Sequence, residues 1–443
     1  MAIRQVLTIL AGCIMSMLGV GCGEDAKPAD EETTYTLTIS AVGDGTTQPA
    51  PGTHTYVAGT TVSATAAPQS GSTFVGWLGD ASGTSPPAIV MDGDKTVVAK
   101  FTWGKSEVSG IPNLPQNGVP RPSGAPGNLK VLDWAGFRGT VSYTLDDSQP
   151  SHIEHYAELQ ATGIPMTFYV NKETAIGDLA TWRQVLADGH EIGNHTVDHC
   201  HAPSPTAPDL NGCAFGPDQP NAPAGATPES EIDDNTAWIK SAIGQSDVWT
   251  MATPFGDTNW LPYARPRFFL NRDVFQAMVA PNDASDPAHL PCYMAGAVEF
   301  GGIDDASATF NGLIDTARSS GQWLIFLFHS ILPTQAQWFG MVDIAQITAS
   351  ADHLKALGDV WADTLVSIGA YWSAQRLVGS VTPVSTAGVT TWTWTLPPHF
   401  PPRKYLRVVV DGGTLTQDGA PVPWDEHGYY EVALDNGTLS LGP

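Results

Sequence analysis

Basic residues are scarce in this sequence. Lys and Arg account for only 20 of its 443 residues, against 45 Asp and Glu, which gives a formal net charge of -25 at pH 7. A surface with this excess of negative charge repels the phosphates of nucleic acids and the headgroups of anionic lipids. The scarcity of basic residues therefore excludes nucleic acid as a partner and suits a soluble exported protein.

The sequence also lacks a long hydrophobic run. Its most apolar segment, residues 6–20, follows one Arg and precedes an acidic segment. Because this segment is too short to span a bilayer comfortably, it predicts a secretion signal rather than a retained transmembrane helix. It ends in Leu-Gly-Val-Gly-Cys, which resembles a bacterial lipobox with Cys22 as the lipidated residue, so residues 1–22 are interpreted as a lipoprotein-type signal peptide. The alternative is ordinary signal cleavage, so we expect either a lipoprotein of the cell surface or outer membrane, tethered only by its lipid, or an extracellular protein.

Cysteine is rare too, with five residues in the chain. If Cys13 is removed with the signal and Cys22 is lipidated, Cys200, Cys213 and Cys292 remain. Cys200 and Cys213 are close enough in sequence to form a structural disulfide in an exported chain. Zinc ligation by Cys200 is an alternative interpretation. Cys292 would be left unpaired, so a different pairing stays open.

Changes in composition divide the rest of the chain. An acidic tether is followed by short alternating segments typical of an all-β module, and then by a stretch rich in Pro and Gly that is typical of a linker. Next, strand-like and helix-like segments alternate, which predicts a parallel sheet or barrel with its site at the C-terminal ends of the strands. A small β unit ends the chain. The predicted boundaries are 23–33, 34–102, 103–130, 131–378 and 379–443.

Within residues 131–378 the pattern predicts individual elements. Helices are expected at residues 151–163 and 175–189, where apolar side chains recur at helical spacing. Strands are expected in several apolar runs bounded by Gly, Pro or polar residues. These runs are residues 139–147, 164–170, 190–195, 248–256, 321–330 and 365–372.

The N-terminal β module resembles the bacterial repeat domain common in surface proteins. The resemblance is carried by Val75-Gly76-Trp77 and by residues 93–97, and it implies a spacer. The aromatic residues of both β modules are expected in their cores, and stacking on sugars is the alternative. They are Tyr56, Phe74 and Trp77 in the first module and Trp392 and Trp394 in the last.

The chemically suggestive residues follow predicted strands. Asp146 and Asp147 end one strand, His195 and His199 lie four residues apart after another, and His329 follows a third. Two histidines four apart on a helical turn share a face and can bind one metal. Three protein ligands leave a coordination position open, and a spare carboxylate can take a proton from water. Singly, the aspartates could cap a helix and His329 could be a core histidine, but the joint order favours a metal-dependent hydrolase.

These motifs resemble those of the polysaccharide deacetylase family, the NodB-homology domain. Thr-x-Asp-Asp matches residues 144–147, His-Ser/Thr-x-x-His matches residues 195–199, and Leu-x-His matches residues 327–329. The resemblance covers about residues 131–376. It implies a distorted (β/α) barrel, here flanked by a small N-terminal all-β module and a small C-terminal β unit.

The resemblance also implies roles for single residues. Asp147, His195 and His199 would bind the metal, Asp146 would be the general base and His329 the general acid. The backbone N–H of Phe255, after Pro254, would stabilise the oxyanion.

The sequence departs from the family in two places. The family's third motif begins with an Arg that pairs with the base, but residues 252–256 read Ala-Thr-Pro-Phe-Gly, so Asp146 is expected to lack a cationic partner. The fourth motif has no evident counterpart. Asp304, Asp305 and Asp315 are candidates to orient His329, although a surface role is expected for each.

By this resemblance, the expected protein is a zinc-dependent hydrolase that removes N-acetyl groups from a chitin-like or peptidoglycan-like carbohydrate and releases acetate. The same ligands also accept cobalt or nickel. An O-acetyl esterase acting on xylan or a similar polysaccharide is the nearest alternative, and a catalytically silent carbohydrate-binding surface protein is another. We expect a monomer whose partner is an acetylated polysaccharide or oligosaccharide.

Overall fold

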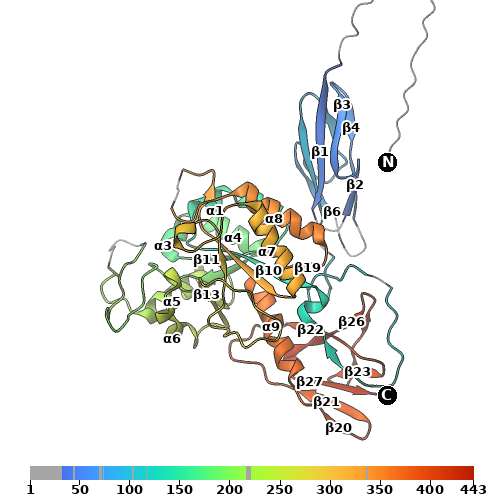
Figure 1. Cartoon of the computed structure of the whole chain (residues 1–443), viewed down its shortest axis with the longest axis vertical. Coiled ribbons are helices and arrows are strands. Elements are labelled where there is room, and N and C mark those ends of the chain that lie inside the picture. The colour runs from blue at the N-terminus through green and yellow to red at the C-terminus, as the bar shows by residue number, and fades with distance from the viewer. Residues whose placement is uncertain are drawn as a thin grey trace, which may run out of the picture.

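A computed structural model describes residues 32–42, 45–68, 72, 74–101, 104–116, 118–215, 221–335 and 338–443. The predicted signal peptide, Cys22 and most of the predicted tether lie outside the described residues. Figure 1 shows three parts: an N-terminal β module that projects from one end, a central α/β domain, and a C-terminal β unit. Among the helices of these described ranges, none is long and apolar enough to cross a membrane.

The N-terminal module is all-β, as its alternating sequence predicts. Its main sheet has the order β3-β1-β8-β6, and β2 pairs with β5 and β4 with β7. Trp77 is buried with Leu37 and Val97, and its ring packs 5.5 Å from that of Phe74. The aromatic residues therefore serve the core of the module. Its strands are β1 (Thr34–Val42), β2 (Gly45–Gln48), β3 (Gly52–Val57), β4 (Thr61–Ser63), β5 (Thr65–Pro68), β6 (Phe74–Gly79), β7 (Ala88–Val90) and β8 (Lys95–Phe101).

The sheet of the central domain is parallel and built around β10 (Gly139–Leu145). Its order is β14-β13-β12-β11-β10-β16-β15, while β19 pairs with the first residues of β10 and β11 with its last two. No ladder of described residues joins β14 to β15, so the barrel is open there, and the expected distorted (β/α) barrel is confirmed. The other strands are β11 (Thr167–Val170), β12 (Glu191–Asn194), β13 (Thr250–Ala252), β14 (Leu270–Arg272), β15 (Tyr293–Met294), β16 (Trp323–Phe328) and β19 (Val360–Ala362).

Helices cover this sheet, so its strands are buried on both faces. Every residue of β10 and of β16 is buried, which explains their continuous apolar runs. The two predicted helical segments are helical, although each is divided into short pieces. The helices are α1 (Pro150–Glu154), α2 (Tyr156–Ala161), α3 (Lys172–Ala175), α4 (Leu179–Ala187), α5 (Pro228–Trp238), α6 (Leu261–Ala264), α7 (Ser307–Ser320), α8 (Ile344–Leu357) and α9 (Leu365–Gly379).

The strand expected at residues 365–372 is wrong. This segment opens α9, whose N-terminus is capped by the side chain of Thr364, which accepts a hydrogen bond from the backbone N–H of Ser367. Helix α9 packs against β10 on one side and against β9 (Lys130–Val131) and β22 of the C-terminal unit on the other. A helix buried on most sides is apolar all round, so its sequence loses the 3.6-residue period that would identify it.

The C-terminal unit contains two small antiparallel sheets, in the orders β20-β21-β27-β23-β24 and β25-β26-β22-β9. Trp392 and Trp394 are buried in it and therefore serve packing. A pair of short strands, β17 (Ile331–Leu332) and β18 (Val342–Asp343), lies before it in the chain. Its own strands are β20 (Val384–Thr386), β21 (Val389–Thr393), β22 (Tyr405–Val409), β23 (Thr414–Gln417), β24 (Ala420–Pro421), β25 (Trp424–Asp425), β26 (Tyr429–Ala433) and β27 (Thr438–Gly442).

The Pro/Gly-rich segment predicted as a linker packs against this C-terminal unit. The buried guanidinium of Arg407 donates to the carbonyls of Ile111 and Pro112 and forms a 3.1 Å ion pair with Glu431. The hydroxyl of Ser109 donates to the same carboxylate at 2.6 Å. The segment has almost no regular secondary structure, but several of its backbone groups form hydrogen bonds with the C-terminal unit.

Candidate metal centre and active site

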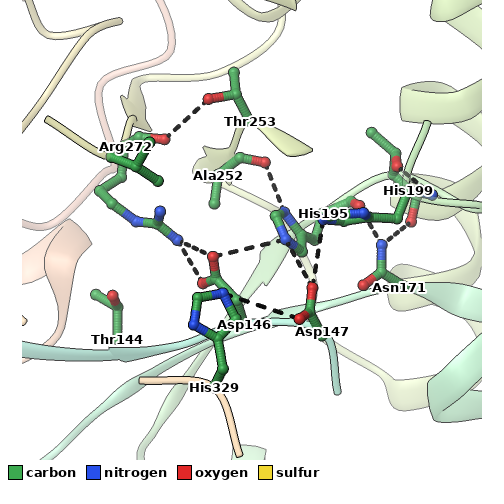
Figure 2. Close-up of polar contacts among 12 residues, drawn as sticks. Thr144, Asp146, Asp147, Asn171, His195, His199, Ala252, Thr253, Arg272 and His329 are labelled. Carbon is green, nitrogen blue, oxygen red and sulfur yellow. Dashed lines mark hydrogen bonds and ion pairs between the residues drawn. The ribbon is translucent and has the colours of Figure 1, made fainter. Parts of the chain in front are cut away.

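The chemically suggestive residues meet at the C-terminal edge of the parallel sheet. Asp146 and Asp147 follow β10, His195 follows β12, and His329 follows β16. Carboxyl ends of neighbouring parallel strands lie at one edge, which is where α/β proteins place their sites. Figure 2 shows these side chains pointing toward one another.

Three side chains offer ligand atoms to one position. Asp147 Oδ1 lies 3.3 Å from His195 Nε2 and 3.4 Å from His199 Nε2. A tetrahedral ion with bonds of about 2.1 Å separates its ligand atoms by about 3.4 Å. Asp147 Oδ1 is also buried without a hydrogen-bond partner among the described residues. The ligand atoms of the three residues all lie within 4.8 Å of one another. These distances and the unsatisfied oxygen both fit a divalent metal.

The orientation of His195 follows from its second ring nitrogen. His195 Nδ1 bonds the carbonyl oxygen of Ala252 at 2.8 Å, which assigns the proton to Nδ1 and turns Nε2 toward Asp147. The side-chain amide of Asn171 donates to the carbonyl oxygens of His195 and Thr196. His195 is therefore held at both its ring and its backbone.

The loop from His195 to His199 is not the helical turn that the spacing suggested. Thr196 and His199 have φ values of 67° and 52°, so the backbone reverses and brings the second imidazole beside the first, with ring centroids 4.7 Å apart. Asp147, Ser148 and Phe255 also have positive φ values, at 75°, 50° and 57°. Such conformations are unfavourable for non-glycine residues and cluster at functional sites.

Two hydrogen bonds hold Asp147 in place, one from Gln149 and one from Thr174. The amide of Gln149 donates to Asp147 Oδ2 at 3.1 Å, and the hydroxyl of Thr174 donates to the Asp147 carbonyl at 2.9 Å. Burial opposes the charge of Asp147, but the imidazole of His195 beside it holds the pKa of Asp147 well below its usual range. Asp147 is therefore an ionised carboxylate with one oxygen fixed and the other available.

The two histidines respond differently to their surroundings. Burial lowers the pKa of His199 to about 3, against the opposing charge of Asp147, so this imidazole is neutral. Burial has the same tendency at His195, but the charges of Asp146 and of the adjacent Asp147 raise the pKa of His195 above its usual range. Since metal ligands must be neutral imidazoles, a metal would displace the proton held by His195.

The expectation that Asp146 lacks a cationic partner is wrong. The guanidinium of Arg272, at the end of β14, donates to both carboxylate oxygens of Asp146 (Figure 2). Both side chains are almost fully buried, with exposures of 0% and 4%. Burial disfavours the charge of Arg272, but the carboxylate of Asp146 raises the pKa of Arg272 above its usual range.

Arg272 lies one strand away from the position at which the family motif described above would place an arginine. In the pairing of β13 with β14, Arg272 lies directly opposite Ala252, the residue that stands where the family has Arg. In the sequence, only one local feature points to Arg272: an apolar run, Phe-Phe-Leu at residues 268–270, followed by polar residues. An apolar run also precedes Asp146. Sequence reasoning missed this strand and therefore missed the cation.

His329 lies beside the two aspartates, with its Nε2 4.0 Å from Asp147 Oδ2 (Figure 2). Its carbonyl oxygen bonds His152 Nε2 at 2.7 Å, and its ring meets the edge of Phe339 with centroids 5.0 Å apart. Burial lowers the pKa of His329, which the charge of Asp147 opposes. In the described part of the chain, His329 Nδ1 has no hydrogen-bond partner.

The three carboxylates considered as partners of His329 are engaged elsewhere or exposed. Asp305 accepts a hydrogen bond from the backbone N–H of Asp343, and Asp315 bonds His353 at 2.9 Å on the surface. Asp304 is exposed to solvent. None of them orients His329.

Phe255 packs against His199, one of the candidate metal ligands. The ring centroid of Phe255 lies 4.3 Å from that of His199, in an edge-on arrangement, and 4.1 Å from that of His201, in a stacked one. Pro254, the preceding residue, is buried. Cys200, directly after His199, forms a disulfide with Cys213. Cys292 is buried and unbonded to sulfur.

Comparisons with known proteins agree with both resemblances drawn from the sequence. Residues 137–263 match the model of the polysaccharide deacetylase family, and residues 35–105 match that of the divergent InlB B-repeat domain. The chain thus carries a polysaccharide deacetylase domain after a bacterial repeat module. The first match includes the Asp-Asp and His-His motifs and the segment at Phe255, and it ends before His329.

Individual proteins show more limited similarity. A gellan lyase from a Bacillus species is 36% identical over 75 residues. The match covers 16% of this chain and only 3% of the length of that relative. A family 4 carbohydrate esterase from Streptomyces lividans, in complex with acetate, is 16% identical, with a TM-score of 0.33 over 53% of this chain and 95% of that one. A CE4 family pseudoenzyme from Bacillus anthracis is 12% identical, with a TM-score of 0.33 over 52% and 65%. At this level the structural matches carry no argument about activity.

The buried ion pair predicts a large effect of Arg272→Met on stability. Removal of the guanidinium leaves Asp146 buried and unpaired, which should lower the free energy of unfolding by about 3–5 kcal/mol. Urea unfolding of the metal-free protein measures this change. The matched control is Arg265→Met, because Arg265 forms an exposed ion pair with Asp286 that is worth at most about 1 kcal/mol. Equal effects of the two substitutions would contradict the assigned role of Arg272.

Proposed function

We propose that this protein is a metal-dependent hydrolase that removes N-acetyl groups from a carbohydrate and releases acetate. The observation that carries the proposal is the combination at one sheet edge of three candidate metal-ligand atoms, a carboxylate paired with Arg272, and the imidazole of His329. Each part alone has an ordinary structural explanation. Together they would supply a metal site, a base and an acid around one position, a combination that suits amide hydrolysis.

Asp147, His195 and His199 would hold the metal. Two imidazoles and one carboxylate suit zinc and also accept cobalt or nickel. When bound, such an ion acts as a Lewis acid toward the acetyl carbonyl and makes water a better nucleophile at neutral pH.

Asp146 would take the proton of the attacking water. Arg272 neutralises the charge of Asp146 and fixes both of its oxygens, so the carboxylate is aimed before substrate arrives. The backbone N–H of Phe255 is a candidate donor to the developing oxyanion. His329 would protonate the amide nitrogen as the carbon–nitrogen bond breaks, which leaves acetate and a free amino sugar.

An O-acetyl esterase is the second candidate, and the surroundings of His329 favour it. Among the described residues, Nδ1 of His329 has no hydrogen-bond partner, so no carboxylate orients the imidazole or supports its positive charge. An ester tolerates a weak acid because its leaving alcohol needs less protonation than an amine. Export, lipidation at Cys22 and a monomeric state remain predictions from the sequence.

The metal assignment predicts that the purified protein binds about one equivalent of zinc. His195→Ala and His199→Ala should each remove one of three ligands and abolish both metal content and acetate release. Elemental analysis after dialysis measures metal content, with His353→Ala, a surface histidine, as the control. Full zinc content in a protein that lacks both His195 and His199 would end this assignment.

The assignment of Asp146 predicts a separation between metal content and turnover. Asp146→Asn keeps the shape of the side chain and all three metal ligands, so zinc should remain while kcat falls by about 10²- to 10⁴-fold. Asp304→Asn, at an exposed carboxylate, is the control. Turnover near the wild-type value in Asp146→Asn would show that another group is the base.

His329→Ala separates the two candidate functions. If His329 protonates a leaving amine, its loss should reduce acetate release from an N-acetylated sugar far more than from an O-acetylated one. The measurement compares kcat/KM of each variant on an N-acetylglucosamine oligomer and on acetylated xylan. Wild-type activity on the ester alone would favour the esterase, and no acetate from either substrate in the zinc-loaded protein would favour a silent binding protein.

A further inference from the structure

The loop that carries both candidate histidine ligands is held by side chains rather than by regular secondary structure. This ligand loop, residues 195–199, follows β12, and the N–H groups of its last four residues each donate to a side-chain oxygen. The N–H of Thr196 donates to Asn194 at 2.8 Å, and that of His199 donates to the hydroxyl of Thr196 at 3.1 Å. Both of these acceptors are close to their donors in sequence.

The two central N–H groups depend on a distant residue. Those of Val197 and Asp198 both donate to Glu231 Oε2, at 3.1 Å and 2.9 Å. Glu231 lies on α5, 33 residues beyond Asp198 in the chain, and is only 2% exposed. Successive N–H groups that point to one side of a turn form a concavity that binds anions. The side chain of Glu231 occupies this concavity of the ligand loop.

Helix α5 is itself bound to the strands beside the site. The side-chain amide of Asn194 donates to the carbonyl of Ile232 at 3.0 Å and to the hydroxyl of Thr236 at 2.8 Å. The amide of Asn235 donates to the carbonyl of Val170, the last residue of β11, at 2.8 Å. The side chain of Glu231 therefore projects from a helix whose position relative to β11 and β12 is fixed.

The second ligand, His199, needs this support more than the first. His195 Nδ1 is held by the carbonyl of Ala252, whereas His199 Nδ1 has no hydrogen-bond partner among the described residues. The ring of His199 is thus placed by its backbone and by packing against Phe255. That backbone has a positive φ of 52°, which a non-glycine residue keeps only where its surroundings hold it.

Stabilisation of α5 is the ordinary alternative role for Glu231. An acidic residue in the first turn of a helix interacts favourably with the helix dipole, and Glu229 and Glu231 both lie in the first turn of α5. Glu229 is exposed, as such a role allows. Burial of Glu231 is costly for a carboxylate unless hydrogen bonds compensate it, and the compensating donors belong to the ligand loop.

We propose that Glu231 is a positioning residue that sets the conformation of the ligand loop and thereby the affinity of the site for its metal. This inference rests on the proposed metal-dependent function. Glu231 acts on His199 through the backbone of Val197 and Asp198. Without its carboxylate, two buried N–H groups lose their acceptor, so the loop rearranges and the second imidazole no longer faces Asp147.

The test measures the Kd for zinc by competition with a chromophoric chelator. Glu231→Ala should raise this Kd by about 10- to 100-fold, the usual effect of removing a residue that supports a metal ligand. Glu231→Gln should restore most of the affinity, because its amide oxygen can accept from both N–H groups. Glu229→Ala, which removes the other acidic side chain of the same turn, should leave the Kd unchanged.

Ile232→Val separates positioning from a general loss of stability. Ile232 is fully buried beside Glu231 in the sequence, so its truncation destabilises the fold without removing a hydrogen bond of the ligand loop. Its Kd for zinc should match that of the wild type. If Glu231→Ala does not fold, Glu231→Asp, whose carboxylate is one methylene shorter, should show the rise instead. An unchanged Kd, no rescue by Glu231→Gln, or an equal rise in Ile232→Val would overturn the proposal.

Hydrogen exchange tests the same role in the metal-free protein. The amides of Val197 and Asp198 should exchange about tenfold faster in Glu231→Ala than in Ile232→Val, as expected for the loss of a hydrogen bond. The outcome is separable from that of the proposed function. Absence of zinc binding by the wild type would refute the metal assignment, and the exchange rates would still test Glu231. Equal rates in the two variants would then contradict its role.

Discussion

The buried ion pair of Arg272 with Asp146 is the interaction on which the rest of the site depends. Two neighbouring carboxylates at the end of β10 are buried, and a buried charge is costly unless it is paired or binds a metal. Arg272 pairs with Asp146, which leaves Asp147 as the carboxylate that requires a cation. Because the two charges are compensated separately, adjacent residues can take different roles: Asp147 faces the histidines and Asp146 faces the reacting position.

The parallel sheet makes this division possible. The carbonyl of Ala252 holds His195, and Arg272, which pairs with Ala252 on the next strand, holds Asp146. Two neighbouring strands therefore fix one proposed metal ligand and the proposed base. The strained backbone at Asp147 and His199 is tolerated because buried hydrogen bonds surround it. The candidate ligands, the candidate base and the cation that orients the base are thus all placed by strand ends of one sheet.

Much of the site could be predicted from the sequence because its signals are local. Asp146, Asp147 and His329 each end an apolar run, and His195 and His199 lie within five residues of each other. Arg272 could not be found this way, because its role depends on the register between β13 and β14 and on no motif of its own. The left-handed conformations at Thr196 and His199 were equally hidden, since neither residue type signals them.

The fold shows the same division between local and long-range information. A parallel sheet with its site at the C-terminal ends of the strands followed from the alternation of elements, whereas α9 was taken for a strand because burial on most sides erased its helical period. The Pro/Gly-rich segment suggested a free linker. Arg407 and Glu431 instead bind it to the C-terminal unit, through contacts that span 295 and 322 residues of the chain. Tertiary contacts decided each of these cases.

The most direct test of the central claim is a zinc titration of the metal-free protein, with acetate release from an N-acetylglucosamine pentamer as the readout. If Asp147, His195 and His199 hold one catalytic ion beside Asp146, the rate rises with added zinc, reaches its maximum at about one equivalent, and disappears again on chelation. Acetate release that is independent of zinc, or no release at full zinc occupancy, would contradict the account.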